Sequence, residues 1–292
     1  MKAACAWDLL SYFGSGEKMK KIIFDFGANN GDDIPYYLKK ADLVVAVEAH
    51  PVLAALIADR FSKEITSGRL IVENCVLNCD DATGDVAFYI HTSNHVLSQF
   101  PRPDEALLTD FEVVFLPSRT PLDIIKTHGE PYYIKIDIEH YDHVVLEHLF
   151  ANKIFPPYIS AEFHSVDVFC LLISLGKYKS FKIVDGASVA QEFINVRVRT
   201  ASGDEETISF PHHAAGPFGE DIAGGWMNSQ NAFCRLGLEG TGWKDIHASR
   251  IDEPDENAAV TLGSVAKMAA YLKLRSRFRF LTRLHREFKR TN

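Results

Sequence analysis

Residues 21–48 read KIIFDFGANNGDDIPYYLKKADLVVAVE, and the rest of the chain can be interpreted around this stretch. An apolar run from Ile22 to Phe26 is short enough for a buried strand, and a glycine-bearing turn follows it. A helical pattern and a second apolar run then lead to Glu48. A strand, a glycine turn, a helix and a strand ending in an acid are typical of the nucleotide-binding half of a doubly wound α/β sheet.

The turn indicates which ligand this half could bind. It carries only two glycines, Gly27 and Gly31, whereas a dinucleotide site needs G-x-G-x-x-G. Asp25 would repel a pyrophosphate but suits a ligand with an ammonium and a sulfonium group, such as S-adenosylmethionine. Glu48 stands where such folds hold both ribose hydroxyls. We therefore expect an S-adenosylmethionine site in which Asp25 and Gly27 sit in a turn outside the core; the alternative is a tight turn without a ligand.

Composition narrows the class of protein. With 292 residues, 47% of them hydrophobic, the chain can form one large α/β domain with an insertion, or two domains. No stretch approaches the length of a membrane-spanning helix, and the N-terminus makes a poor signal peptide. Five cysteines without a C-x-x-C motif favour reduced thiols and a cytoplasmic location.

Apolar runs alternate with helical patterns over most of the chain, which predicts a mostly parallel sheet with helices on both faces. Residues 91–111 read as a long loop, and loops of this length are often functional. The expected strands are 22–26, 43–47, 70–77, 86–90, 113–116, 132–139, 158–163, 181–184 and 193–198, and the expected helices are 34–40, 51–63, 121–127, 141–150 and 166–175.

Three further segments complete the expected organisation. Residues 1–20 contain a short lead-in helix before a domain spanning 21–250. Residues 200–248 are rich in glycine and are interpreted as an irregular insertion over the carboxyl edge of the sheet, with a surface excursion as the alternative. Residues 258–292 are predicted to form a basic amphipathic helix.

Three segments together carry a family resemblance. FDFGANNGDD (24–33), VAVEAHP (45–51) and YIKIDIEHYDHVVLEHL (133–149) resemble the FkbM family of S-adenosylmethionine-dependent methyltransferases. One departure is that this chain has His140 and Asp142 where the family usually shows Gly and often Glu. The resemblance implies a seven-stranded methyltransferase sheet and methyl transfer mostly to a hydroxyl oxygen. It also implies acceptors such as sugars, polyketides or other secondary metabolites.

The segment KIDIE offers the main candidates for chemistry. Lys135, Asp137 and Glu139 alternate with apolar residues, so we expect them to project to one side of a strand. The two acids could orient the methionine portion of the donor, bind a metal or take a proton. The alternative is an acidic pair favoured by a helix dipole.

Histidines supply further candidates. His164 ends a predicted strand, and its neutral imidazole would suit a general base, although a structural role is the alternative. His140 and His143 could share a helix face as metal ligands, but a polar helix face is the preferred interpretation and no metal site is predicted. His212 or His213 could reach the acceptor.

The expected site residues fall into two groups. We expect catalysis by Asp137, Glu139 and His164. We expect the cofactor S-adenosylmethionine to be bound by Asp25, Gly27, Asn29, Gly31, Glu48, Val76, Asn78 and Asp137.

The sequence thus favours an S-adenosylmethionine-dependent O-methyltransferase that acts on a hydroxyl of a sugar, polyketide or related metabolite. One alternative is an oxidoreductase that uses a nicotinamide cofactor on the same fold, which the two-glycine turn and Asp25 argue against. Another is a non-catalytic binding protein with a methyltransferase fold, for which the departure at His140 leaves room.

The C-terminal stretch bears on partners rather than on catalysis. Residues 264–292 carry nine Lys or Arg and one Glu, while the whole chain has a net charge of −8. Such a helix could lie on an anionic membrane, dock on an acidic face of its own domain or of a second subunit, or simply pack with its arginines solvated. Nucleic acid is not the expected partner, because the acidic body would repel phosphates.

Overall fold

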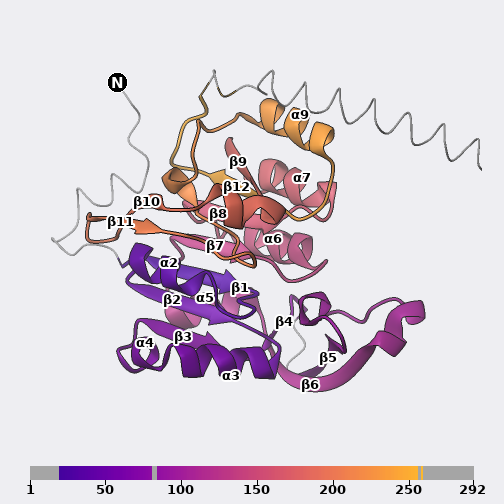
Figure 1. Ribbon diagram of the computed structural model, residues 1–292. Helices are drawn as coiled ribbons and strands as arrows, with labels where there is room; N and C mark the ends of the chain where they lie inside the picture. The colour runs from indigo at the N-terminus through magenta and orange to yellow at the C-terminus, as the bar shows by residue number, and fades with distance from the viewer. Residues whose placement is uncertain (1–19, 81–83, 256–257, 259–292) are drawn as a thin grey trace, which may run out of the picture.

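The computed structural model describes residues 20–80, 84–255 and 258, and its centre is a seven-stranded sheet with the order β3-β2-β1-β7-β8-β12-β9 (Figure 1). Only β12 (Lys244–Ser249) runs antiparallel to its neighbours in this sheet. The other strands are β1 (Ile22–Phe26), β2 (Leu43–Val47), β3 (Leu70–Glu73), β7 (Tyr133–Ile136), β8 (Tyr158–Glu162) and β9 (Ser180–Asp185). The predicted doubly wound, mostly parallel sheet is therefore confirmed.

Both faces of this sheet are buried, as its unbroken apolar strands predict. In β1, Ile23 packs into one apolar cluster and Phe24 into the other, since neighbouring side chains of a strand point to opposite faces. The Phe24 cluster includes α5 (Pro121–His128), α6 (Asp142–Ala151), α7 (Val166–Ser174) and α9 (Ser229–Glu239). The Ile23 cluster includes α2 (Ile34–Lys40), α3 (Pro51–Arg60) and α8 (Val189–Glu192), and α4 (Ser62–Thr66) follows α3.

The third predicted strand, 70–77, is wrong as a single element. The strand β3 ends at Glu73, and the Asn74 side chain then donates hydrogen bonds to the carbonyl oxygens of Glu48 and Ala49, at 2.8 and 3.0 Å. The chain leaves the central sheet here, and Val76–Leu77 becomes β4 of a separate three-stranded sheet. An apolar run alone cannot reveal such a change of partner.

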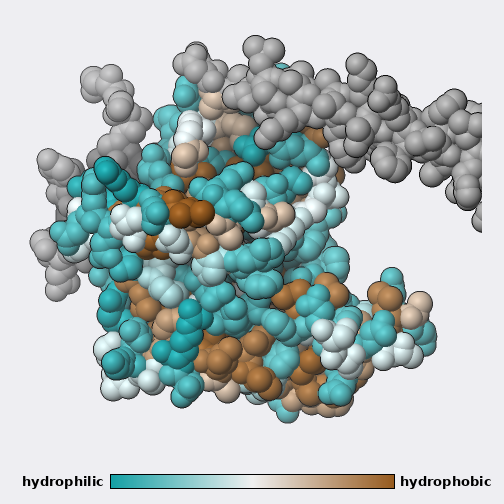
Figure 2. Space-filling model, viewed as in Figure 1, coloured by the Kyte–Doolittle hydropathy of each residue, from teal (hydrophilic) through white to brown (hydrophobic). Residues whose placement is uncertain are grey.

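This second sheet forms a side lobe, defined as residues 76–119. It has the order β4-β6-β5 and projects at the lower right of Figure 1, with β5 at Asp85–His91 and β6 at Phe111–Arg119. The connection predicted as a loop contains only two 3-10 turns, η1 (His95–Leu97) and η2 (Glu105–Asp110). Val113 and Phe115 on β6 are 50% and 70% exposed. Figure 2 shows brown apolar patches at the lower right of the molecule, where Figure 1 places this lobe.

Residues 200–248 are more regular than the sequence suggests. They contain β11 (Glu205–Ile208), which pairs with β10 (Val196–Arg199), as well as α9 and most of β12. Because β12 lies between β8 and β9, part of the expected insertion belongs to the central sheet itself. The irregular part is the stretch from 209 to 228, with the short turn η4 (Gly219–Asp221). A further short turn, η3 (Gly186–Ser188), follows β9.

Two predicted helices fall on residues outside this description. Nearly all of the lead-in helix at 1–20 and of the basic helix at 258–292 lies beyond the described residues. In the part of the chain that is described, no helix is both long enough and apolar enough to cross a membrane. The four cysteines described there are free thiols.

The glycine turn after β1 is tightly enclosed. Gly27 has a φ of +90°, and a Cβ placed on it would lie 1.8 Å from the carbonyl oxygen of Asp137. Its N–H and that of Ala28 both donate to the carbonyl oxygen of Val47, at 3.0 Å. Gly27 thus lies in the expected turn but leaves no room for a side chain, which lets the ends of β1 and β7 approach each other. The expectation of a turn position outside the core is wrong for Asp25, which belongs to β1 and is fully buried.

Gly27→Ala should therefore destabilise the fold much more than a left-handed conformation alone would cause. The matched control is Gly68→Ala, because Gly68 has a φ of +72° and nothing within 4 Å of its would-be Cβ. The control should cost about 1–2 kcal/mol for backbone strain. Gly27→Ala should cost about 1–3 kcal/mol more through overpacking. Equal losses of unfolding free energy in the two variants, measured by urea denaturation, would contradict the enclosure of this turn.

Candidate functional site

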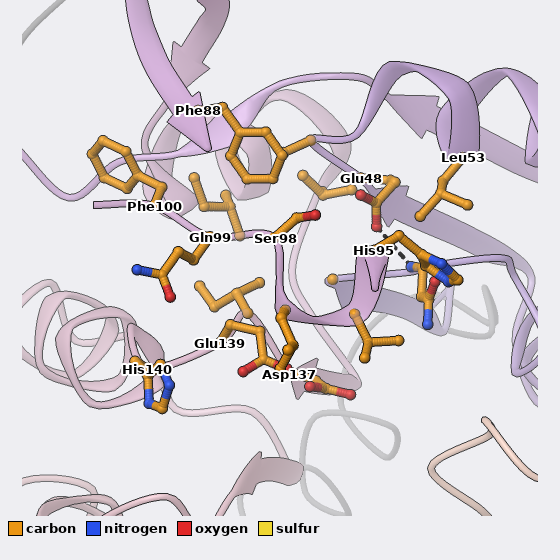
Figure 3. Close-up of a pocket in the computed structure, with 18 of the residues that line it drawn as sticks. Glu48, Leu53, Phe88, His95, Ser98, Gln99, Phe100, Asp137, Glu139 and His140 are labelled. Atoms are coloured by element: carbon orange, nitrogen blue, oxygen red, sulfur yellow. Dashed lines mark hydrogen bonds between the residues drawn. The ribbon is translucent and has the colours of Figure 1, made fainter. Parts of the chain in front are cut away.

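A hollow of about 470 Å³ opens at the carboxyl ends of the central strands (Figure 3). Its floor is formed by residues that follow β1, β2, β7 and β8, and residues 95–100 of the side lobe line its opposite side. This is where open α/β sheets bind ligands. Of the predicted residues, it is lined by Gly27, Asn29, Glu48, Val76, Asp137, Glu139 and His164.

Glu48 follows β2 and is held by the backbone. Its carboxylate accepts hydrogen bonds from the N–H groups of Asn29 and His50, at 2.7 and 2.8 Å. Burial raises the pKa of Glu48 to about 7, although both hydrogen bonds lower it. Beside it, the side-chain oxygen of Asn29 is buried without a hydrogen-bond partner in the described chain. Both groups can therefore accept hydrogen bonds from a ligand.

Lys135 lies beneath the other side of the hollow and is buried. Its ammonium group donates to the carbonyl oxygen of Gly27 at 3.2 Å and lies 3.2 Å from Asp137, 3.5 Å from Asp25 and 3.8 Å from Asp33. Burial lowers the pKa of Lys135, but these carboxylates outweigh it and raise that pKa above its usual range. The lysine therefore stays charged and holds Asp137 at the rim.

Three predicted donor-binding residues do not line the hollow. Asp25 is fully buried, and burial raises its pKa to about 6 even though Lys135 lowers it. A Cβ on Gly31 would lie 3.0–3.2 Å from side chains of α2, α3 and the residue after α3, so this glycine serves packing. Asn78 is buried in the side lobe, where its side-chain oxygen accepts from the N–H of Asp80 at 3.0 Å. Strand ends can be predicted from apolar runs, but which side chains at those ends face the hollow cannot.

The turn after β7 has an unusual backbone. Glu139 and His140 have φ values of +42° and +65°, and neither is a glycine. This region favours glycine because a Cβ there crowds the backbone. It accounts for the glycine that the FkbM resemblance leads one to expect at position 140. The turn places Glu139 beside Asp137 at the hollow, with His140 next to them (Figure 3).

His164 is paired with an acid that the sequence analysis did not select. Its Nε2 lies 2.8 Å from Oε2 of Glu162, which ends β8 and is 6% exposed. Burial lowers the pKa of His164, but the adjoining Glu162 carboxylate outweighs this effect and raises that pKa to about 9. The expected neutral imidazole is therefore a charged one near neutral pH. Glu162 could have been found by its place at a strand end beside β7.

Glu139 differs from the other acids of the hollow. Burial, followed by the nearby charges of Asp137 and Glu162, raises its pKa to about 8. Its side chain makes no hydrogen bond or ion pair within the described residues. Its carboxyl group is therefore free to form a hydrogen bond or an ion pair with a ligand.

The remaining histidines separate into two groups. The rings of His140 and His164 lie 4.8 Å apart, whereas His143 lines only a small second hollow beside them. His213 lines the main hollow with Trp243, and the ring of His212 lies 5.4 Å from that tryptophan. Among the described residues, no group of three His, Cys, Asp or Glu side chains is arranged to hold a metal ion.

The lobe contributes residues that sequence reasoning missed. Phe88 on β5 and the whole stretch 95–100 line the hollow, with Leu77 from β4. These side chains are mostly apolar, and several are visible in Figure 3 around the upper part of the hollow. The length of the 91–111 loop was the one signal that pointed to them.

Comparison with known proteins gives similarities of fold only. No protein-family model and no functionally described protein matches the sequence of the chain. Among solved structures, methyltransferase FkbM from Methylobacillus flagellatus KT is 18% identical over 59% of this chain and 42% of its own, with a TM-score of 0.38. This chain thus spans less than half of that protein.

Two O-methyltransferases are also similar. The S-adenosylmethionine-dependent enzyme from Thermotoga maritima is 9% identical over 82% of this chain and 62% of its own, with a TM-score of 0.33. The one from Bacillus cereus, in complex with SAH, is 10% identical over 79% and 74%, with a TM-score of 0.35. At such identities and TM-scores, function has to be argued from the geometry of the site.

His140→Gly should stabilise the fold by about 1 kcal/mol, because glycine adopts the left-handed conformation without strain. The matched control is Glu147→Gly, an exposed position in the middle of α6, where glycine should cost about 1 kcal/mol. Urea denaturation measures the free energy of unfolding of both variants, which should rise for His140→Gly and fall for Glu147→Gly. Destabilisation by His140→Gly would mean that the contacts of the imidazole outweigh the backbone strain.

Proposed function

We propose that this protein is an S-adenosylmethionine-dependent methyltransferase of the FkbM kind that methylates a hydroxyl group of a sugar, polyketide or related metabolite. The observation that carries the proposal is the placement of Glu48 and Asp137 at the carboxyl ends of β2 and β7, lining one hollow beside the Gly27 turn. Two carboxylates so placed suit a ligand with a ribose diol at one end and an ammonium group at the other.

The residues present fit such a donor. Glu48 would accept both ribose hydroxyls, and the unpartnered side-chain oxygen of Asn29 would accept a further hydrogen bond. Val76, Leu77 and Phe88 supply an apolar wall suited to an adenine ring. Asp137, held by Lys135, would bind the donor's ammonium group.

Acids around the glycine turn disfavour the nicotinamide alternative. Asp33 precedes α2 and Asp25 is the last residue but one of β1, and both are buried next to Lys135. A pyrophosphate at the start of α2 would have to approach these carboxylates, which repel its charge. The turn is therefore better suited to a cationic donor than to a dinucleotide.

The bound donor supplies a methyl group that is already activated, so the chain has to position the acceptor and remove its proton. His164 is the proposed base. Because its Nε2 faces Glu162 at 2.8 Å, we assign the N–H to that nitrogen, which leaves Nδ1 to accept the acceptor's proton. Glu162 would then stabilise the imidazolium that forms. A base whose pKa is raised is the stronger one toward an alcohol.

Glu48→Gln tests the donor site. Replacing the charged acceptor should weaken S-adenosylmethionine binding by about 1.5–3 kcal/mol, or roughly ten-fold and upward. Since the pKa of Glu48 is about 7, its carboxyl is protonated below that pH, and wild-type affinity should rise as pH increases through 7. Calorimetric titration on both sides of this pH measures both effects.

The matched control for this variant is Glu147→Gln, which removes the same charge from an exposed position on α6. It should bind the donor like the wild type at every pH. If Glu48→Gln also binds normally, or if neither protein binds the donor, the proposed donor site is wrong.

Glu162→Gln tests the proposed base. Turnover should rise with pH as His164 loses its proton near pH 9, and removing the Glu162 charge should move this midpoint to lower pH. His164→Ala should lower turnover about 10²–10⁴-fold with little change in donor affinity. The measurement is transfer of a labelled methyl group into a small-molecule cell extract across this pH range. An unchanged midpoint in Glu162→Gln would assign the base to another residue.

A further inference from the structure

Acidic side chains outnumber charged basic ones in the lining of the hollow, where the imidazolium of His164 is the one cation among the described residues. Its lining residues include four carboxylates and, within the described chain, no lysine or arginine. The four are Glu48, Asp137, Glu139 and Glu162. An acceptor that carries a phosphate or carboxylate would meet repulsion from those of the four that are ionised, because charges interact strongly in a partly buried site.

Three of these acids are already compensated. Glu48 accepts two backbone hydrogen bonds, Asp137 lies 3.2 Å from the Lys135 ammonium, and Glu162 lies 2.8 Å from His164. Glu139 makes no hydrogen bond or ion pair among the described residues, and the charge of His164 lowers its pKa less than burial and the neighbouring acids raise it. Its carboxyl group therefore keeps a proton near neutral pH, and a ligand that brings a positive charge beside it would favour the ionised form.

An aromatic ring lines the same hollow. Trp243 is 38% exposed, and a Cβ on Gly186 would lie 2.4 Å from its Nε1, so part of the indole packs directly on the Gly186 backbone. The His213 ring is stacked near it, with centroids 6.4 Å apart. Tryptophan is the side chain whose face attracts cations most strongly.

We propose, on the basis of the proposed function, that the methyl acceptor is a hydroxyl compound that also carries a positive charge, such as an amino alcohol or an amino sugar. Its ammonium group would be bound by Glu139 and Trp243. A neutral polyol could also stack on the indole. It would, however, leave the Glu139 carboxyl group without an ionic partner, so the arrangement favours the cation.

Binding of matched probes to the full chain saturated with S-adenosylhomocysteine tests this. Choline and 3,3-dimethylbutan-1-ol are both alcohols of nearly the same shape, and only choline is charged. Glucosamine and glucose form a second pair. We expect the cation of at least one pair to bind about ten-fold more tightly than its neutral counterpart. Glu139→Gln should abolish this preference, whereas Glu147→Gln, on the exposed face of α6, should retain it.

The inference is overturned if neither choline nor glucosamine binds more tightly than its neutral counterpart, which includes the case that none of the four probes binds. It is also overturned if the preference for the cation survives in Glu139→Gln. Failure of the proposed function is recognised separately, because S-adenosylhomocysteine would then not bind in the first step. Normal binding of S-adenosylhomocysteine with no preference for charge refutes only the cationic acceptor. Glu139→Gln that still binds S-adenosylhomocysteine is folded, so loss of preference in it is not a loss of structure.

Discussion

The site depends on one buried ammonium group. Lys135 on β7 is the register partner of Asp25 on β1, and its Nζ reaches the Gly27 carbonyl and Asp137 as well. It thereby joins the carboxyl ends of the two central strands at the point where the hollow begins. Removing one partner of such a buried set leaves the others uncompensated, which costs far more than an exposed ion pair contributes. The charge of this lysine therefore stabilises the arrangement of acids beneath the hollow.

The same lysine cannot neutralise all the acids around it. Asp25 and Asp33 are fully buried, and burial raises their pKa values to about 6 and about 7 against the opposing effect of Lys135. These acids thus hold protons that an exposed carboxyl would lose. Asp137 lies at the edge of this set, with 32% of its side chain exposed, and is the member that a ligand can reach. Burial therefore divides a run of similar acids into supporting and binding roles.

Much of the central sheet could be predicted because its strands are buried on both faces and appear as apolar runs between turns. The antiparallel strand β12 could not be predicted in this way, because His247 and Asp245 interrupt its apolar pattern although both are buried. The site residues at strand ends were found by the rule that ligands bind there. Asp25, Gly31 and Asn78 were placed wrongly, because strand position does not tell which side chain points into a cavity and which into the core.

The backbone after β7 shows how a departure from a family pattern can be built into a site. A glycine at position 140 would take the left-handed conformation freely, whereas His140 takes it at a cost of roughly 1–3 kcal/mol. In this conformation the His140 ring lies 4.8 Å from the His164 ring and lines the hollow. The charged His164 lowers the pKa of His140, after burial, so His140 stays neutral beside it. Strain at this turn thus sets a neutral imidazole next to the residue that we propose as the base, where a glycine would leave open space.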